Sequence, residues 1–215
     1  YDFDRDSVAD TLIATTTGMW LMRGEKDAAT GKGTGKLLPA IPVSGAPLIR
    51  LVLVDIDDDG IKDVYGAGPL SLETQDKSGA AVFLTKNGGI RQVQQLPLEG
   101  EVRAIATGDM DRNEVMDLVA GAQEDKVAIQ IIPALAKDQL LCPGKDQPKR
   151  LCKSVKKVTE LGQATIFGLP TAYSLSGGIS SLVVADFVIS GKEVYPDIAI
   201  GRGESATLTL CPNNE

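Results

Sequence analysis

An acidic loop that recurs along the chain constrains the fold more than any other feature. Residues 49–63 read I-R-L-V-L-V-D-I-D-D-D-G-I-K-D, and residues 102–117 read V-R-A-I-A-T-G-D-M-D-R-N-E-V-M-D. The same acidic pattern, D-F-D-R-D-S-V-A-D, occupies residues 2–10, and a diverged fourth copy runs over 186–197. The copies begin at positions 2, 55, 109 and 186, which are 53, 54 and 77 residues apart. Regular spacing of this size indicates a repeat architecture.

Each acidic loop is followed by short runs that are typical of β-strands. The closing aspartates begin D-T-L-I-A-T, D-V-Y-G-A-G, D-L-V-A-G-A and D-I-A-I-G-R, and further β-prone runs occupy 80–85, 127–132 and 206–210. A unit of about 53 residues has room for four short antiparallel strands, the size of a propeller blade. We therefore predict an all-β fold: a β-propeller of about four blades, in which residues 1–215 form a single domain or part of a larger propeller.

The longer third spacing coincides with a basic segment, which we interpret as an insertion in the third repeat at 133–165. Within it, Cys142 and Cys152 bracket the sequence C-P-G-K-D-Q-P-K-R-L-C, and we predict that they form a disulfide. The alternative is a pair of reduced thiols, and Cys211 is left over in either case. Residues 31–36, G-K-G-T-G-K, lack the spacing of a phosphate-binding loop and are interpreted as a flexible inter-strand loop.

Alternating aspartates in a tight loop can direct their carboxylates toward one centre. Such carboxylates repel one another unless a hard cation lies between them, and calcium takes six to eight oxygen ligands in flexible geometry. Gly60 suits the sharp turn of the second loop, whereas Ser7 and Glu114 stand at that position in the first and third loops, which we expect to be strained or weaker. The predicted ligands are Asp2, Asp4, Asp6, Asp10 and the carbonyl of Val8; Asp55, Asp57, Asp59, Asp63 and the carbonyl of Ile61; and Asp109, Asp111, Asn113, Asp117 and the carbonyl of Val115.

The acidic loops have two alternative interpretations. An EF-hand loop begins similarly but needs a bidentate Glu at its twelfth position, which here is Ile13, Gly66 or Ala120. A solvated turn without metal is the plain alternative for every loop. It is the preferred interpretation of the fourth loop, because Val188 and Ser190 occupy ligand positions there.

The pattern D-x-D-x-D-G-x-x-D-V-x-G-A-G at 55–68 resembles the FG-GAP or VCBS-type repeat of integrin α-subunit propellers and of many secreted bacterial proteins. The similarity covers nearly the whole chain except the insertion. It implies a calcium loop in a hairpin between neighbouring strands of a blade, and two to three calcium ions in the first three loops. Because propellers of this family usually have seven blades, we expect the chain to be a fragment whose remaining blades come from another chain or segment. The alternative is a smaller closed assembly.

Composition and charge narrow the function. The chain has no histidine, which removes the commonest general base, and its net charge of −7 disfavours nucleic-acid binding. Membrane insertion is not expected, because the sequence has no run of eighteen apolar residues. We predict a non-catalytic calcium-binding module for protein or carbohydrate recognition or adhesion, located extracellularly, at the cell surface or in the periplasm. The alternatives are an architectural subunit of an extracellular surface or filament complex and, less favoured, the accessory propeller of a metal-dependent hydrolase.

Overall fold

The structure is a computed structural model that describes most of the chain. The described residues are 1–57, 59–69, 77–123, 128–134, 167, 170–175, 178–185, 187, 196–202 and 207–211. Within them there is no helix, and every strand pair is antiparallel, so the predicted all-β class is confirmed. It follows that these residues include no helix long and apolar enough to cross a bilayer. No closed barrel or complete propeller is formed by the described residues, and the number of blades stays a prediction.

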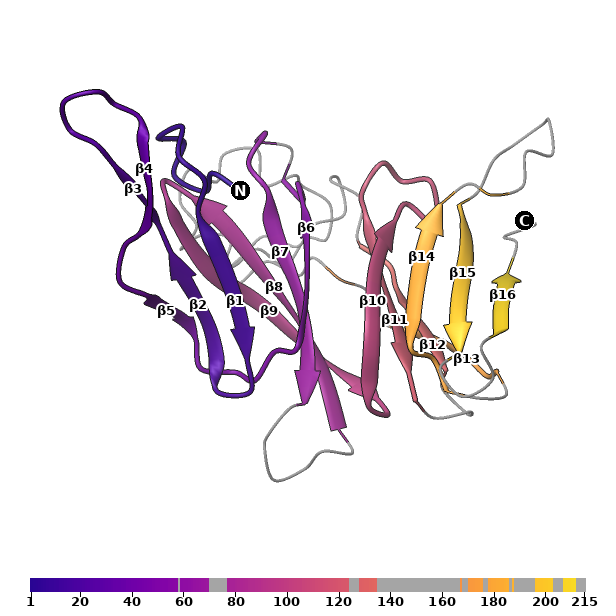
Figure 1. The fold of residues 1–215 in the computed structure, drawn as a ribbon. Coiled ribbons are helices and arrows are strands. Elements are labelled where there is room, and N and C mark those ends of the chain that lie inside the picture. Colours follow the sequence, from indigo (N-terminus) through magenta and orange to yellow (C-terminus); the bar gives the residue numbers. More distant parts are fainter. Residues whose placement is uncertain are drawn as a thin grey trace, which may run out of the picture.

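The described strands form four successive sheets, I to IV, which lie side by side in Figure 1, and a separate two-stranded hairpin. Sheet I contains β1 (Thr11–Thr15), β2 (Gly18–Met22) and β5 (Ile41–Ser44). In the sequence, the hairpin of β3 (Gly24–Lys26) and β4 (Gly33–Leu37) separates β2 from β5. Sheet II contains β6 (Arg50–Val54), β7 (Asp63–Pro69), β8 (Lys77–Lys86) and β9 (Gly89–Glu99). Sheet III contains β10 (Val102–Gly108), β11 (Asp117–Ala122), β12 (Ile129–Ile132) and β13 (Thr171–Tyr173), and sheet IV contains β14 (Ser181–Ala185), β15 (Asp197–Arg202) and β16 (Thr207–Cys211).

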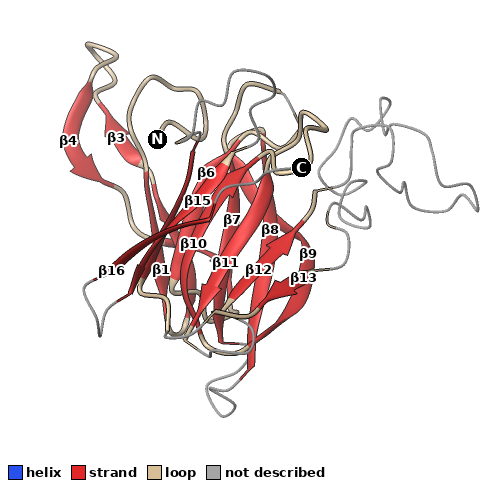
Figure 2. Cartoon of the chain, turned by 90° about the vertical axis from the view of Figure 1, so that its right-hand side faces the viewer, coloured by secondary structure: helices blue, strands red, loops and turns tan. Residues whose placement is uncertain are grey.

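The order of strands within the sheets follows the sequence, because nearly every strand pairs with the next one along the chain. The predicted runs at 80–85, 127–132 and 206–210 correspond to β8, β12 and β16. The segment 31–36 is different from its predicted form: most of it belongs to β4, in a hairpin that projects from the body of the molecule in Figure 2. The predicted insertion at 133–165 falls between β12 and β13, and its cysteines lie outside the described residues.

The sheets stack face to face, and this explains why their central strands are apolar on both sides. All of β11 is buried, as is β7 except for Pro69. Because successive side chains of a strand point to opposite faces, such strands need a covered sheet on each side. Gly121 in β11 permits this close packing, since a Cβ there would lie 2.7 Å from Ile179, which precedes β14 of the neighbouring sheet.

Three apolar cores join consecutive sheets. The core between sheets I and II contains Phe3, Met19, Leu21, Val64 and Phe83. The core between sheets II and III contains Tyr65, Val82, Leu84, Leu118, Ile132 and Phe167, with the rings of Tyr65 and Phe167 4.8 Å apart. The core between sheets III and IV contains Val119, Ile129, Ile179, Ile198 and Ile200. Each fully buried side chain of this kind contributes about 1.5–3 kcal/mol, so these cores are the main source of stability.

Two glutamines also join sheets II and III through polar contacts. The buried amide of Gln130 on β12 accepts a hydrogen bond from the Glu99 amide N–H at 2.9 Å and donates one to the Glu99 carbonyl at 2.8 Å. The side-chain amide of Gln94 on β9 likewise donates a hydrogen bond to the Phe167 carbonyl at 3.4 Å and accepts one from the Phe167 N–H at 2.9 Å. Each side-chain amide therefore takes the place of a backbone partner, and the peptide groups of Glu99 and Phe167 are satisfied.

Candidate metal centres

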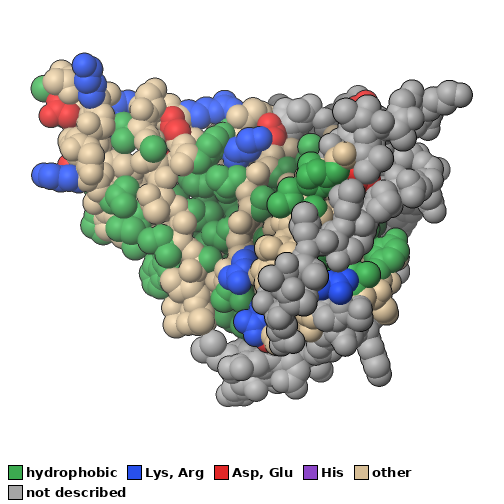
Figure 3. Space-filling view, turned by 45° about the vertical axis from the view of Figure 1, so that its right-hand side comes forward, with side chains coloured by type: hydrophobic (Ala, Val, Ile, Leu, Met, Phe, Trp, Pro, Cys, Tyr) green, Lys and Arg blue, Asp and Glu red, His purple; other side chains and the backbone are tan. Residues whose placement is uncertain are grey.

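The acidic loops occupy equivalent places in the four sheets. The second, third and fourth loops join β6 to β7, β10 to β11 and β14 to β15, and the first loop precedes β1. Because these strand pairs run in the same sense, the first three loops lie at the upper edge of the molecule in Figure 1. Figure 3 shows lysine and arginine side chains along this edge and few carboxylates. Loop positions are counted below from the opening aspartate, so that Asp55 is position one and Asp63 is position nine.

The opening carboxylate of each loop shapes the turn that follows it. Asp55 accepts hydrogen bonds from the backbone N–H groups of Asp59, at 3.2 Å, and Gly60, at 3.0 Å. The same bonds to positions five and six are made by Asp2, at 3.1 and 2.9 Å, and by Asp109, at 2.9 and 3.0 Å. The side-chain oxygen of the residue at position five accepts a hydrogen bond from the backbone N–H of the residue at position seven, at 2.8 Å in all three loops. Side-chain oxygens thus hold three loops of different sequence in one conformation.

The closing carboxylate connects three segments of its sheet. Asp63 is fully buried and accepts the N–H of Ile56 at 2.9 Å and the N–H of Thr85, near the end of β8, at 2.7 Å. The matching pairs are Asp10 with Phe3 and Gly24, and Asp117 with Met110 and Ala134. In the described part of the fourth loop, Asp197 accepts the N–H of Phe187 at 3.0 Å. The sequence pattern predicted a ligand at this position but not its structural role in joining strands.

The turns require left-handed backbone at position six. Gly60 has φ 80°, and Ser7 and Glu114 have φ 72° and 65°. Position four is also left-handed at Arg5 and Arg112, with φ 61° and 59°. A side chain in this conformation costs roughly 1–2 kcal/mol, whereas glycine adopts it freely. The expected strain of the first and third loops is therefore confirmed, and their weaker metal affinity stays a prediction.

Three carboxylates converge in each of the first three loops. Oxygens from Asp2, Asp4 and Asp6 lie within 4.8 Å of one another, and the same holds for Asp55, Asp57 and Asp63 and for Asp109, Asp111 and Asp117. Asp10 and Asp59 are outside these groups, and position five of the third loop is the amide Asn113 instead of a carboxylate. The side chains at position seven serve as anchors: those of Ile61 and Val115 are buried, and that of Val8 is half-buried. The structure thus brings together three carboxylates in each of the three loops.

The electrostatics of the clusters show that their negative charge is incompletely balanced. Burial raises the pKa of Asp63 to about 7 and that of Asp117 to about 7. Burial, followed by the nearby charge of Asp59, also raises the pKa of Asp57. The pKa of Asp4 is raised by burial and then by Asp10 and Asp6. A carboxyl group whose pKa is raised in this way favours a proton or another cation over the bare anion.

Two cations near the clusters were not foreseen from the sequence. Arg23 lies 3.4 Å from Asp4, and Lys86, at the end of β8, lies 3.8 Å from Asp57. Both come from the strand ends that sheet formation brings beside the loops. Each supplies one positive charge against three or more carboxylates, so each cluster keeps a net negative charge.

The residues present fit a hard divalent cation such as calcium. The side-chain donors of the converging groups are all carboxylate oxygens, the ligand type that calcium prefers. In the second loop, Oδ1 of Asp57 is buried and has no hydrogen-bond partner among the described residues. A buried anionic oxygen without a partner is costly, and a bound cation would remove that cost.

Most of the fourth loop lies outside the described residues. Asp186, Val188 and Ser190 lie outside the described residues, and Asp197 accepts the Phe187 N–H as described above. No protein-family model matches the chain, and no curated protein matches it significantly. The likeness to FG-GAP and VCBS-type repeats therefore depends on the loop pattern itself.

Proposed function

We propose that this chain is a non-catalytic calcium-binding module of the FG-GAP or VCBS type that serves protein or carbohydrate recognition outside the cytoplasm. The observation that carries the proposal is the threefold recurrence of one hydrogen-bonded loop that gathers three carboxylates within 4.8 Å. Three loops of different sequence that share one set of backbone hydrogen bonds and each gather three carboxylates favour a shared ligand over chance turn formation.

The second loop illustrates how calcium would be held. Asp55, Asp57 and Asp63 would supply the converging carboxylates, with Asp59 and the carbonyl of Ile61 as further oxygens. The first loop would use Asp2, Asp4, Asp6 and Asp10 with the carbonyl of Val8, and the third would use Asp109, Asp111, Asn113 and Asp117 with the carbonyl of Val115. Bound calcium supplies the positive charge that offsets repulsion among these groups. The protein's own contribution is a turn already closed by the backbone bonds to the opening and closing aspartates.

The arrangement of the sheets supports a propeller-like assembly of about four blades. Sheets II and III each have four antiparallel strands, and the three cores join consecutive sheets face to face. This is the packing expected of neighbouring blades. A ligand-binding role fits the loops, which share one edge of the molecule and which calcium would make rigid (Figure 1). Calcium sites of modest affinity are useful outside the cell, where the ion is abundant.

An architectural role in a surface or filament complex is the second candidate. Its support is the exposure of large apolar side chains on the outer sheets I and IV. Ile41 on β5 is 46% exposed and Val183 on β14 is 55% exposed. Apolar side chains exposed on sheets suit assembly with further sheets. Measuring the mass of the chain in solution distinguishes a monomer from such an assembly.

Thermal unfolding with excess EGTA and then with millimolar calcium tests the calcium proposal. We expect calcium to raise the midpoint clearly, because one site saturated at a hundred times its Kd stabilises the fold by about 2.7 kcal/mol. Asp57→Asn should remove part of this rise. Asp27→Asn is the matched control, since Asp27 is a half-buried aspartate in the β3–β4 hairpin, outside the acidic loops. A midpoint that does not respond to calcium, or an equal loss in both variants, would contradict the proposal.

A further inference from the structure

We propose that the first acidic loop holds a ligand of the second loop in position, so that the two loops bind calcium as a coupled pair. The residues that make the connection are Tyr1 and Arg5, whose side chains reach from the first loop to the backbone of the second. The inference rests on the proposed calcium function, and it adds a dependence of one site on the other.

The hydroxyl of Tyr1 contacts the peptide groups on either side of Ile61. It accepts a hydrogen bond from the Lys62 N–H at 2.9 Å and makes a longer contact, at 3.5 Å, with the Gly60 carbonyl. The Lys62 N–H and the Ile61 carbonyl belong to one planar trans peptide unit, in which the two groups point in opposite directions. By fixing the N–H, Tyr1 directs the Ile61 carbonyl away from itself. That carbonyl is the predicted backbone ligand of the second loop.

Arg5 makes a second contact with the same stretch of backbone. Its guanidinium donates a hydrogen bond to the Asp59 carbonyl at 2.8 Å. Arg5 is the left-handed residue at position four of the first loop, so the direction of its side chain depends on the turn that Asp2 and Asp4 close around it. The first loop must therefore be in its closed form to place Arg5 against the second loop.

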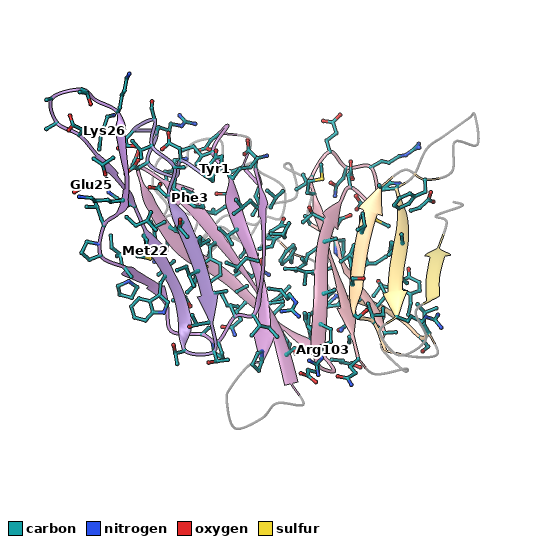
Figure 4. All side chains as sticks on the ribbon, in the orientation of Figure 1. Tyr1, Phe3, Met22, Glu25, Lys26 and Arg103 are labelled. Carbon is teal, nitrogen blue, oxygen red and sulfur yellow. The ribbon has the colours of Figure 1, made fainter. Side chains whose placement is uncertain are left out.

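Tyr1 is likewise tied to the carboxylates of its own loop. Its ring packs against Phe3 with centroids 5.1 Å apart, and the Phe3 N–H donates to Oδ2 of Asp10. Phe3 is 1% exposed and shares a core with Val64, which follows Asp63 in the second loop's sheet. Figure 4 shows Tyr1 and Phe3 together between β1 and β7. The closing carboxylate of the first loop is thus joined to the second loop's sheet through packed side chains.

These contacts predict reciprocal coupling between the two sites. A cation that neutralises Asp2, Asp4 and Asp6 favours the closed first loop and hence the position of Tyr1 and Arg5. The second loop then loses less conformational entropy when it binds its own cation, because part of its backbone is already held in place. By linkage, occupancy of the second site strengthens binding at the first by the same factor.

Calorimetric titration of the full chain with calcium tests the coupling. The third loop is silenced with Asp109→Asn and Asp111→Asn, and the binding step of the second loop is identified by its loss in Asp57→Asn. In this background, Tyr1→Phe removes one hydroxyl and keeps the contact with Phe3. We expect it to weaken the second-loop step by about three- to tenfold, the worth of one hydrogen bond. The control is Tyr173→Phe, because Tyr173 is an exposed tyrosine on β13.

Two further measurements make the result specific. Asp2→Asn with Asp4→Asn should also weaken the second-loop step, and this effect should shrink when Tyr1→Phe is already present, because both changes break one pathway. In calcium-free protein, amide hydrogen exchange at Lys62 should be faster in Tyr1→Phe than in the Tyr173→Phe control, because the Lys62 N–H loses its acceptor.

The outcomes separate this inference from the proposed function. If Tyr1→Phe leaves the second-loop affinity and the Lys62 exchange unchanged while Asp57→Asn removes the second-loop step, the coupling is wrong and the calcium function stands. Equal losses in Tyr1→Phe and Tyr173→Phe also overturn the coupling, because they indicate a general loss of stability. If the chain without substitutions binds no calcium, the proposed function fails and the coupling fails with it.

Discussion

The second and third loops adopt one conformation from different sequences. They read D-I-D-D-D-G-I-K-D and D-M-D-R-N-E-V-M-D, and they share only the aspartates at positions one, three and nine. Position six is Gly60 in one and Glu114 in the other, yet both have positive φ. The opening and closing carboxylates make the same backbone bonds in both loops, with distances of 2.6–3.2 Å. The comparison teaches that the aspartates determine the turn, while glycine only lowers its cost.

The largest expected effect comes from removing a closing carboxylate. Asp63→Ala leaves the N–H groups of Ile56 and Thr85 without their acceptor, and Asp117→Ala does the same to Met110 and Ala134. Two buried donors without partners cost roughly 2–6 kcal/mol, and we expect both variants to lose similar amounts of unfolding free energy in urea. Glu101→Ala, which removes an exposed ion pair with Arg103, is the control and should change little. A large loss in only one of the two alanine variants would show that the loops are not equivalent.

The pH dependence of stability should also be shared between the two loops. Burial raises the pKa of Asp63 and of Asp117 to about 7 from an ordinary 3.8. The folded state therefore binds more protons than the unfolded state between these values, and the stability due to these groups is lost as pH rises through about 7. Linkage gives a slope of about −1.4 kcal/mol per pH unit for each residue in metal-free buffer.

Urea unfolding between about pH 5 and 6.5 measures this slope. Asp117→Asn should reduce the steepness of the slope of unfolding free energy against pH by up to the contribution of one residue, about 1.4 kcal/mol per pH unit, and Asp63→Asn should do the same. The difference between chains cancels the contribution of the other acidic groups. Identical slopes in variant and unsubstituted chain would show that these aspartates do not carry the proton uptake.

The smallest expected effect concerns position six. Glu114→Gly should stabilise the third loop by up to about 1 kcal/mol, because the left-handed conformation no longer carries a side chain and part of the gain is lost to unfolded-state entropy. Gly60→Glu should destabilise the second loop by a similar amount. The thermal unfolding midpoints of both variants, measured in the presence of calcium and compared with that of the unsubstituted chain, test these two changes. The comparison between the loops is contradicted if exchanging the two residues leaves both midpoints unchanged, or if Gly60→Glu prevents loop closure altogether.

The sequence predicted the repeat, the strand class and the converging aspartates, because all of these are local patterns. Strand runs such as 49–54 directly precede the acidic loops in the sequence. Because aspartates alternate with other residues, Asp55 and Asp57 are expected on one side of the chain. The second role of Asp63 was not predictable, because its partner Thr85 is 22 residues away and reaches it only through the pairing of β7 with β8. Lys86 beside Asp57 and Tyr1 beside Lys62 were missed for the same reason.

The serial stacking of the sheets has a consequence for how the molecule unfolds. Since each core joins two consecutive sheets, the total stability is close to a sum of contributions from single sheets and from nearest-neighbour interfaces. Such a one-dimensional system can melt from one end while its middle stays folded. Stabilising a single loop then protects its own sheet and the two interfaces beside it, and the benefit decreases with each sheet further along the row.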